Sequence, residues 1–218
     1  MTSAFSEEIV ESSEQNQIKI AVDHLLDANS DFVKKHNKNY FLPFIKGQTP
    51  KATVLSCADS RVHTHAIDPH PDGDLFLIRN IGNQLAPVQG SIEYGVRHLH
   101  TPLLLILGHT MCGAVRTAMQ EHSDLSPAIK AELDHMHVPL GDAENALIVL
   151  DAVEHNVEDQ ISEAMRLFKD EIDQQKLMVI GAVYDFRNDY QKGYGRLVII
   201  NVNGEKDAQQ INNQLKFK

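Results

Sequence analysis

Five short apolar runs, separated by segments with helical spacing, place the strongest limit on how this 218-residue chain can fold. Each run is nearly continuous and rich in Val, Ile and Leu, which is typical of strands buried on both faces of a parallel sheet. Strands that alternate with helices predict an α/β fold with helices on both faces of the sheet. The runs lie at residues 53–57, 74–78, 103–107, 177–183 and 196–201, and helical spacing marks residues 90–100, 113–122 and 144–168.

The last strand of this sheet is expected to run against the others. The turn sequence Gly193-Tyr194-Gly195 closely precedes the final apolar run, which favours a hairpin between the last two strands. We therefore predict a mostly parallel central β-sheet of about four parallel strands with one antiparallel edge strand, flanked by helices.

The length of the chain fits a single domain, residues 1–218, with a sizeable core. Residues 1–46 precede the sheet and are expected to form an N-terminal helical arm, with helices at residues 16–27 and 30–46. The apolar residues of this arm need to be covered, and we expect them to lie on a neighbouring subunit. They include Ile18, Ile20, Val22, Leu25 and Leu26.

Charge and hydropathy exclude several classes of partner. The formal net charge is −10, which argues against nucleic acid, because a phosphate backbone attracts a basic surface. No apolar run approaches the length of a bilayer span, and residues 1–16 resemble no secretory signal. These observations predict a cytoplasmic protein that binds neither membranes nor nucleic acid.

The chain has only two cysteines, and each follows an apolar run. Cys57 ends the first run, and His109 and Cys112 follow the third. Because the carboxyl ends of neighbouring parallel strands face one crevice, these three side chains are expected to meet. Two thiolates and an imidazole are zinc ligands, and three protein ligands leave a fourth position open, as in catalytic sites. The alternatives are that the cysteines are simply small buried apolar residues or form a single disulfide.

The motifs around these residues resemble those of the β-class carbonic anhydrases. The resemblance is close over roughly residues 45–118 and looser through Glu154-His155-Asn156-Val157 and the strand after Lys176. It is carried by Gly47-Gln48-Thr49-Pro50, Cys57-x-Asp59-x-Arg61, Leu75-Phe76-Leu77-Ile78-Arg79-Asn80, Gly90-Ser91-Ile92-Glu93-Tyr94-Gly95-Val96 and Gly108-His109-Thr110-Met111-Cys112-Gly113-Ala114-Val115.

The resemblance implies a Zn²⁺ enzyme, a carbonate dehydratase, that reversibly hydrates CO₂ to bicarbonate and a proton. Zinc would be held by Cys57, His109 and Cys112, and hydroxide on the metal would be the nucleophile. Asp59 and Arg61 would be catalytic. Arginine can hold a carboxylate by two parallel hydrogen bonds, which keeps Asp59 ionised and lets it orient the hydroxide. A loop salt bridge without a catalytic role is the alternative.

Asp59 is also close enough in sequence to become a fourth zinc ligand, which would close the site. Some family members close in this way at lower pH, and typically have an accessory bicarbonate site with a Trp a few residues before the first zinc cysteine. This chain has no Trp, and Val54 occupies that place. We therefore expect zinc to be open at neutral pH, with Asp59 bonded to Arg61.

Three further residues match the substrate pocket of plant-type family members, which a neighbouring subunit completes. Gln48 can donate a hydrogen bond to a CO₂ or bicarbonate oxygen, and Phe76 and Tyr94 can form an apolar wall. The N–H of Gly113, at a helix N-terminus, can also donate toward the site. The resemblance thus implies a homodimer or higher homo-oligomer. Core packing is the alternative role for Phe76, and helix packing for Tyr94.

Three other functions compete with this hypothesis. The first is carbon disulfide hydrolysis, because a few relatives with the same ligands catalyse that reaction. A zinc-binding or regulatory module without catalysis would more often use four protein ligands and has no need of the Asp59–Arg61 pair. A thiol redox protein would have a Cys-x-x-Cys pair, which the sequence lacks. The remaining histidines, including His63, His65, His70, His98 and His100, are not expected to bind metal.

Overall fold

The computed structural model describes the backbone of residues 2–216 and the side chains of residues 13–216. The chain divides into two compact units, one ending at Gly47 and the other beginning at Gln48. Among the helices of residues 2–216, none combines the length and hydropathy that a membrane span requires.

The first unit is a long helix followed by a short one. Helix α1 (Thr2–Lys35) runs without a break through residues 28–29, where the sequence predicted the gap between two helices. Ser30 Oγ donates to the carbonyl of Leu26 one turn earlier, so its hydroxyl is satisfied within the helix. The break falls instead at Asn37, whose side chain accepts from the N–H of Asn39 and begins α2 (Lys38–Phe41).

Most of the large apolar side chains of residues 13–47 are exposed. Ile18, Leu25 and Val33 of α1 each leave more than half of their surface uncovered. Other exposed apolar residues of this unit are Ile20, Val22, Leu26, Phe32, Phe41, Leu42, Phe44 and Ile45.

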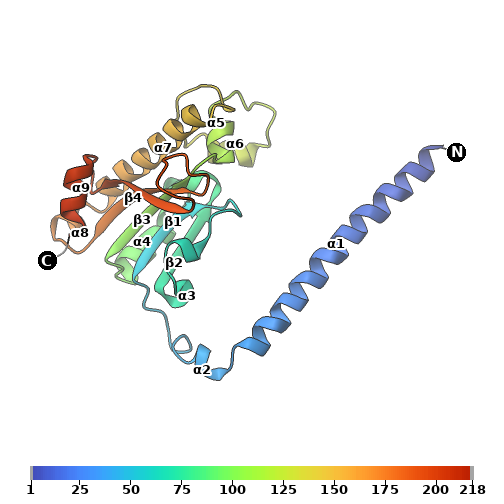
Figure 1. The fold of residues 1–218 in the computed structure, drawn as a ribbon, viewed down its shortest axis with the longest axis horizontal. Coiled ribbons are helices and arrows are strands. Elements are labelled where there is room, and N and C mark those ends of the chain that lie inside the picture. The colour runs from blue at the N-terminus through green and yellow to red at the C-terminus, as the bar shows by residue number, and fades with distance from the viewer. Residues whose placement is uncertain (1, 217–218) are drawn as a thin grey trace. The chain divides into compact units, whose positions relative to one another are not determined.

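The second unit is built on a five-stranded sheet with the order β2-β1-β3-β4-β5 (Figure 1). Strands β1 to β4 pair in parallel and β5 pairs antiparallel with β4, as predicted. The strands are β1 (Ala52–Cys57), β2 (Leu75–Asn80), β3 (Leu103–His109), β4 (Met178–Asp185) and β5 (Arg196–Val202). Ten residues connect β4 to β5, and the two strands pair as the sequence predicted.

Helices and short helical turns connect the strands of the second unit. The helices are α3 (Pro71–Asp74), α4 (Gln89–Glu93), α5 (Gly113–Ala118), α6 (Pro127–Leu133), α7 (Ala146–Leu167), α8 (Lys169–Asp173) and α9 (Ala208–Gln214). The short turns are η1 (Thr64–Ala66), η2 (Ile81–Asn83), η3 (Ala86–Val88) and the π-helical η4 (Tyr94–His98).

Both faces of the sheet are covered, which explains why the strands are almost continuously apolar. On one face, Leu55 and Ile106 pack with Val157 and Ile161 of α7 in one cluster. On the other, alternate residues of the same strands, such as Val54 and Leu105, pack in a second cluster. Successive strand side chains point to opposite faces, so each strand contributes to both clusters.

The contact between α7 and β3 depends on Gly108. A Cβ at this position would lie 2.7 Å from Val157 Cγ2 and 3.1 Å from Val153 Cγ1. We expect Gly108→Ala to lower the free energy of unfolding by about 1–3 kcal/mol, because it overpacks a close contact. Urea unfolding of the full chain measures the change. Gly90→Ala, where a Cβ has nothing within 4 Å, is the matched control and should not destabilise the protein. An equal effect of both changes would contradict this explanation.

Candidate metal centre

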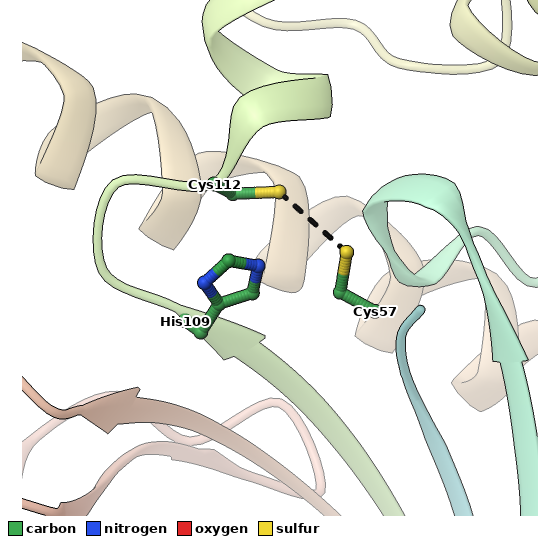
Figure 2. Close-up of side chains that lie close together, drawn as sticks. All are labelled: Cys57, His109 and Cys112. Carbon is green, nitrogen blue, oxygen red and sulfur yellow. Dashed lines mark hydrogen bonds between the residues drawn. The ribbon is translucent and has the colours of Figure 1, made fainter. Parts of the chain in front are cut away.

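The candidate metal ligands lie at the carboxyl ends of two adjacent strands. Cys57 is the last residue of β1 and His109 the last residue of β3. The two strands are parallel, with Ser56 beside Leu107, so their ends reach nearly the same level of the sheet. Figure 2 shows the two side chains turned toward one another above the strands, with Cys112 beside them.

A tight turn after β3 brings the third candidate ligand back to the strand end. Met111 has a left-handed backbone with φ of 51°, and the N–H of Thr110 donates to the carbonyl of Tyr184 on β4. Cys112 follows as the N-cap residue of α5. The chain reversal at Met111 thus lets His109 and Cys112, which are three positions apart, face the same point.

The ligand atoms of Cys57, His109 and Cys112 all lie within 4.8 Å of one another. The two sulfur atoms are 3.8 Å apart and both thiols are free, whereas a disulfide would hold them at about 2.05 Å. All three residues are buried, and the His109 side chain is fully inaccessible. In the part of the chain whose side chains are described, this is the one such group of metal-ligating residues.

The imidazole of His109 fits a metal ion. Its Nδ1 lies 3.1 Å from the carbonyl oxygen of Thr110, and a carbonyl can only accept, so Nδ1 carries the hydrogen. The other ring nitrogen, Nε2, therefore has a free lone pair. It is buried and has no hydrogen-bond partner. A buried acceptor without a partner is costly, and a metal bound by the two sulfurs would satisfy it.

The two thiols share a hydrogen bond that separates their pKa values. The contact with Cys112 lowers the pKa of Cys57 to about 4, and the Gly82 N–H, 3.4 Å from its sulfur, acts in the same direction. The same contact and burial raise the pKa of Cys112 well above the ordinary value of a thiol. One thiolate thus forms readily, and a cation that replaces the shared proton would stabilise the second.

Asp59 and Arg61 form a bidentate pair next to these residues. Arg61 Nε lies 2.9 Å from Asp59 Oδ1, and Nη2 lies 2.6 Å from Oδ2. The guanidinium holds the pKa of the Asp59 carboxyl well below its usual range, and the backbone N–H of Arg61 adds to the effect. Asp59 Oδ2 lies 3.7 Å from His109 Nε2, which places an ionised carboxylate at the edge of the metal position.

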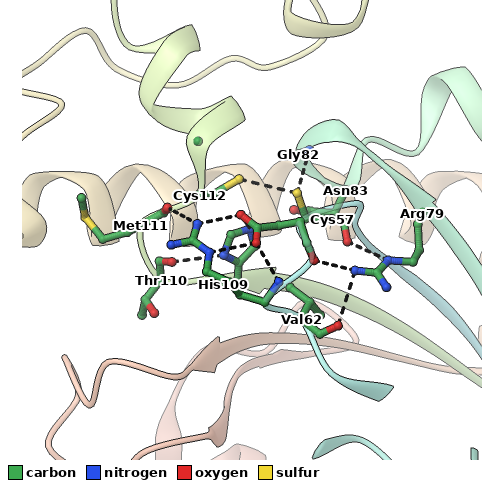
Figure 3. Close-up of polar contacts among 12 residues, drawn as sticks. Cys57, Val62, Arg79, Gly82, Asn83, His109, Thr110, Met111 and Cys112 are labelled. Atoms are coloured by element: carbon green, nitrogen blue, oxygen red, sulfur yellow. Dashed lines mark hydrogen bonds and ion pairs between the residues drawn. The ribbon is translucent and has the colours of Figure 1, made fainter. Parts of the chain in front are cut away.

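Arg79 is a residue of the site to which sequence reasoning gave no role. From β2, its guanidinium donates to the carbonyls of Cys57, Asp59 and Val62, at 3.0, 2.7 and 3.4 Å (Figure 3). It therefore holds the loop that carries the Asp59–Arg61 pair. An arginine directly after the four apolar residues of the strand was the signal that could have marked it.

The residues predicted for the substrate pocket do not gather around the ligands within one chain. Phe76 pairs with Thr53, four positions before the Asn80–Cys57 pair, which places it about 13 Å along the strand from the ligands. Tyr94 contacts Phe76, with ring centroids 5.9 Å apart, and is 44% exposed. Gln48 is exposed at the start of the second unit. Gly113 differs from these three, because it directly follows the ligand Cys112 and begins α5.

Comparison with known proteins identifies the family. The family model for carbonic anhydrase matches residues 52–191, which is more than half of the chain and includes the three candidate ligands and the Asp59–Arg61 pair. The chain belongs to the carbonic anhydrase family. Its relatives place it in the β class. The sequence is 28% identical to beta carbonic anhydrase 3 of Arabidopsis thaliana over 172 residues, which are 69% of this chain and 66% of the relative.

A shorter and more similar match is to carbonic anhydrase 2 of Mycobacterium tuberculosis, at 44% identity over 79 residues. That alignment covers 36% of this chain and 38% of the mycobacterial relative. The chain therefore aligns with less than two thirds of the length of these carbonic anhydrases.

Solved β-carbonic anhydrases share the fold. The structure of the β-carbonic anhydrase CcaA superposes with a TM-score of 0.70 at 20% identity, covering 85% of this chain and 95% of that one. A chain from the crystal structures of two tetrameric β-carbonic anhydrases of Sordaria macrospora matches with a TM-score of 0.68 at 22% identity, covering 85% of this chain and 98% of that one. β-Carbonic anhydrases are zinc enzymes, and the group of Cys57, His109 and Cys112 could hold that metal.

Proposed function

We propose that this chain catalyses the reversible hydration of CO₂ to bicarbonate and a proton. The observation that carries the proposal is the buried, unpartnered Nε2 of His109, which faces two thiols and lies beside an ionised carboxylate. A zinc ion held by Cys57, His109 and Cys112 would lower the pKa of a water at its open fourth position and so supply the nucleophile.

Asp59 is proposed to orient the attacking oxygen. Its Oδ2 lies near the metal position and accepts a hydrogen bond from Arg61, which fixes the carboxylate in place. Because the carboxylate can only accept, a hydroxyl bonded to it would direct its lone pair away from Asp59 and toward CO₂. To coordinate zinc itself, Asp59 would have to break its bidentate pair with Arg61, so we propose an open site at neutral pH.

The test combines metal analysis with two assays on the purified full chain. We expect one zinc per chain and a CO₂ hydration rate far above that of buffer, with carbon disulfide hydrolysis as the parallel assay. A chain that binds zinc without hydrating CO₂ would instead support the alternative of a zinc-binding module.

We propose the cytoplasm as the location of this protein. Both cysteines must stay free thiols to bind zinc, and a reducing compartment such as the cytoplasm would keep them reduced.

The hydration rate is expected to rise with pH from 6 to 9. Arg61 holds the pKa of Asp59 well below its usual range, so this carboxylate stays ionised throughout and contributes no titration. The nucleophile must lose a proton, and two thiolates reduce the charge of zinc. The pKa of a water on this zinc would therefore exceed the value of about 7 that is known for a three-histidine zinc site. Stopped-flow initial rates measure the profile, and a flat profile would contradict the proposed nucleophile.

We also propose that a second subunit supplies Gln48, Phe76 and Tyr94 to the site of the first. Within one chain, Phe76 lies far along its strand from Cys57, and Tyr94 is exposed beside it. The exposed apolar side chains of α1 would contribute to the same assembly by covering a neighbouring subunit. Sedimentation should show a dimer or a multiple of it at assay concentrations, and an active monomer would contradict the proposal.

Mixed assemblies test which subunit supplies the pocket. We expect Tyr94→Ala to lower the hydration rate at least about tenfold, which corresponds to about 1.4 kcal/mol less stabilisation of the transition state. A Cys57→Ser chain has an intact pocket but a broken metal site, and the Tyr94→Ala chain has the reverse. If the pocket acts across the interface, mixing and refolding the two impaired chains should give one complete site per mixed dimer and raise the rate above that of either variant alone. No recovery from dimers shown to be mixed would place the pocket within one chain.

A further inference from the structure

The sulfur of Cys57 receives a hydrogen bond from a turn that is not part of the ligand motif. The N–H of Gly82, in η2 directly after β2, lies 3.4 Å from Cys57 Sγ (Figure 3). Gly82 has φ of 74°, and a Cβ there would lie 2.1 Å from Met136 Cε. The turn thus needs glycine both for its backbone conformation and for space.

Two buried side-chain amides hold the carbonyl of the same glycine. Asn156 Nδ2, on α7, donates to Gly82 O at 3.0 Å, and Gln84 Nε2 donates to it at 2.7 Å. Gln84 Nε2 also donates to Asn156 Oδ1 at 2.7 Å, which fixes the orientation of both amides. Asn156 is 1% exposed and Gln84 is fully buried.

The rest of the turn is also held by hydrogen bonds, both within the turn and from α7. Within the turn, Asn80 Nδ2 donates to Gln84 O, and Gln84 N donates to Asn80 Oδ1. Gln160, one turn after Asn156, accepts from the N–H of Leu85. Burying amides among apolar side chains is costly unless they are bonded, and here the bonds converge on the backbone that faces Cys57.

We propose that Asn156 is a positioning residue for the metal ligand Cys57. By holding the Gly82 carbonyl, it directs the Gly82 N–H at the sulfur. An N–H donor on a thiolate withdraws electron density from it and fixes the direction of its remaining lone pairs. Partners of metal ligands commonly change metal affinity 10- to 100-fold when they are removed. The inference rests on the proposed metal site but not on the reaction that the site performs.

The test replaces Asn156 with leucine, which has a similar volume and no donor. We expect Asn156→Leu to bind zinc about 10- to 100-fold more weakly in competition with a chromophoric chelator. In the cobalt-substituted protein, the thiolate-to-cobalt charge-transfer band should shift, because the sulfur has lost its donor. Asn156→Ser, which keeps a hydroxyl donor, should fall between Asn156→Leu and the wild type in both measurements.

Ile161→Ala is the matched control for simple destabilisation. Ile161 lies on α7 and is 1% exposed in the core, so its truncation weakens packing of the same helix. It should leave the cobalt band and the zinc affinity unchanged. If Asn156→Leu does not fold, Gln84→Met removes the other donor to the same carbonyl and provides the comparison.

Two results would overturn the inference. One is an unchanged cobalt band and zinc affinity in Asn156→Leu, and the other is an equal change in Ile161→Ala. Neither measurement involves CO₂. A wild-type chain that binds cobalt but does not hydrate CO₂ would therefore reject the proposed reaction and leave the role of Asn156 supported by its own data.

Discussion

Replacing Cys57 with serine is expected to abolish both zinc binding and CO₂ hydration. A serine hydroxyl does not ionise near neutral pH, so the site would keep one thiol and one imidazole as ligands, fewer than the three of a catalytic zinc site. We expect the zinc content to fall from about one to less than about 0.1 per chain, and hydration to fall to the rate of buffer. Elemental analysis and stopped-flow rates on the same samples measure both.

Ser56→Ala is the matched control for this change. Ser56 is the preceding residue of β1 and is also buried, but its side chain points to the opposite face of the sheet. This variant should keep its zinc. Full zinc content in folded Cys57→Ser would remove the basis of the proposed site.

Replacing Arg61 with alanine is expected to separate catalysis from metal binding. The change removes both side-chain bonds that hold the Asp59 carboxylate and leaves Cys57, His109 and Cys112 in place. The zinc content should stay at about one per chain, while hydration falls about 100-fold, because misplacing an orienting group by about 1 Å has an effect of that size. Zinc analysis and hydration rates across pH 6 to 9 test the prediction.

The chain offers a matched control for Arg61 in a second arginine. Arg187 also pairs with an aspartate two residues away, Asp189, at 3.1 Å, and its side chain is exposed to a similar degree. Arg187→Ala should therefore show the modest effect of a surface ion pair. Loss of zinc from Arg61→Ala, or an equal loss of activity in both variants, would contradict an orienting role for Asp59.

The class of fold followed from the pattern of apolar residues along the chain. Continuous apolar runs predicted strands buried on both faces, and these strands are found within one or two residues of their predicted ends. The candidate metal site could also be predicted from the sequence, because Cys57, His109 and Cys112 each lie at or just after a strand end. Parallel strands bring their carboxyl ends to one edge of the sheet, so position in the sequence was sufficient to bring these residues together.

Features that depend on contacts between distant segments could not be predicted from the sequence. The bond from Asn156 to Gly82 joins residues 74 positions apart, and no local pattern marks it. Helix α1 is continuous where the local sequence predicted a break, because polar residues such as Ser30 bond within a helix as well as at its ends. The strand register separates Phe76 from Cys57, since pairing between β1 and β2 fixes distance along the strands regardless of residue type.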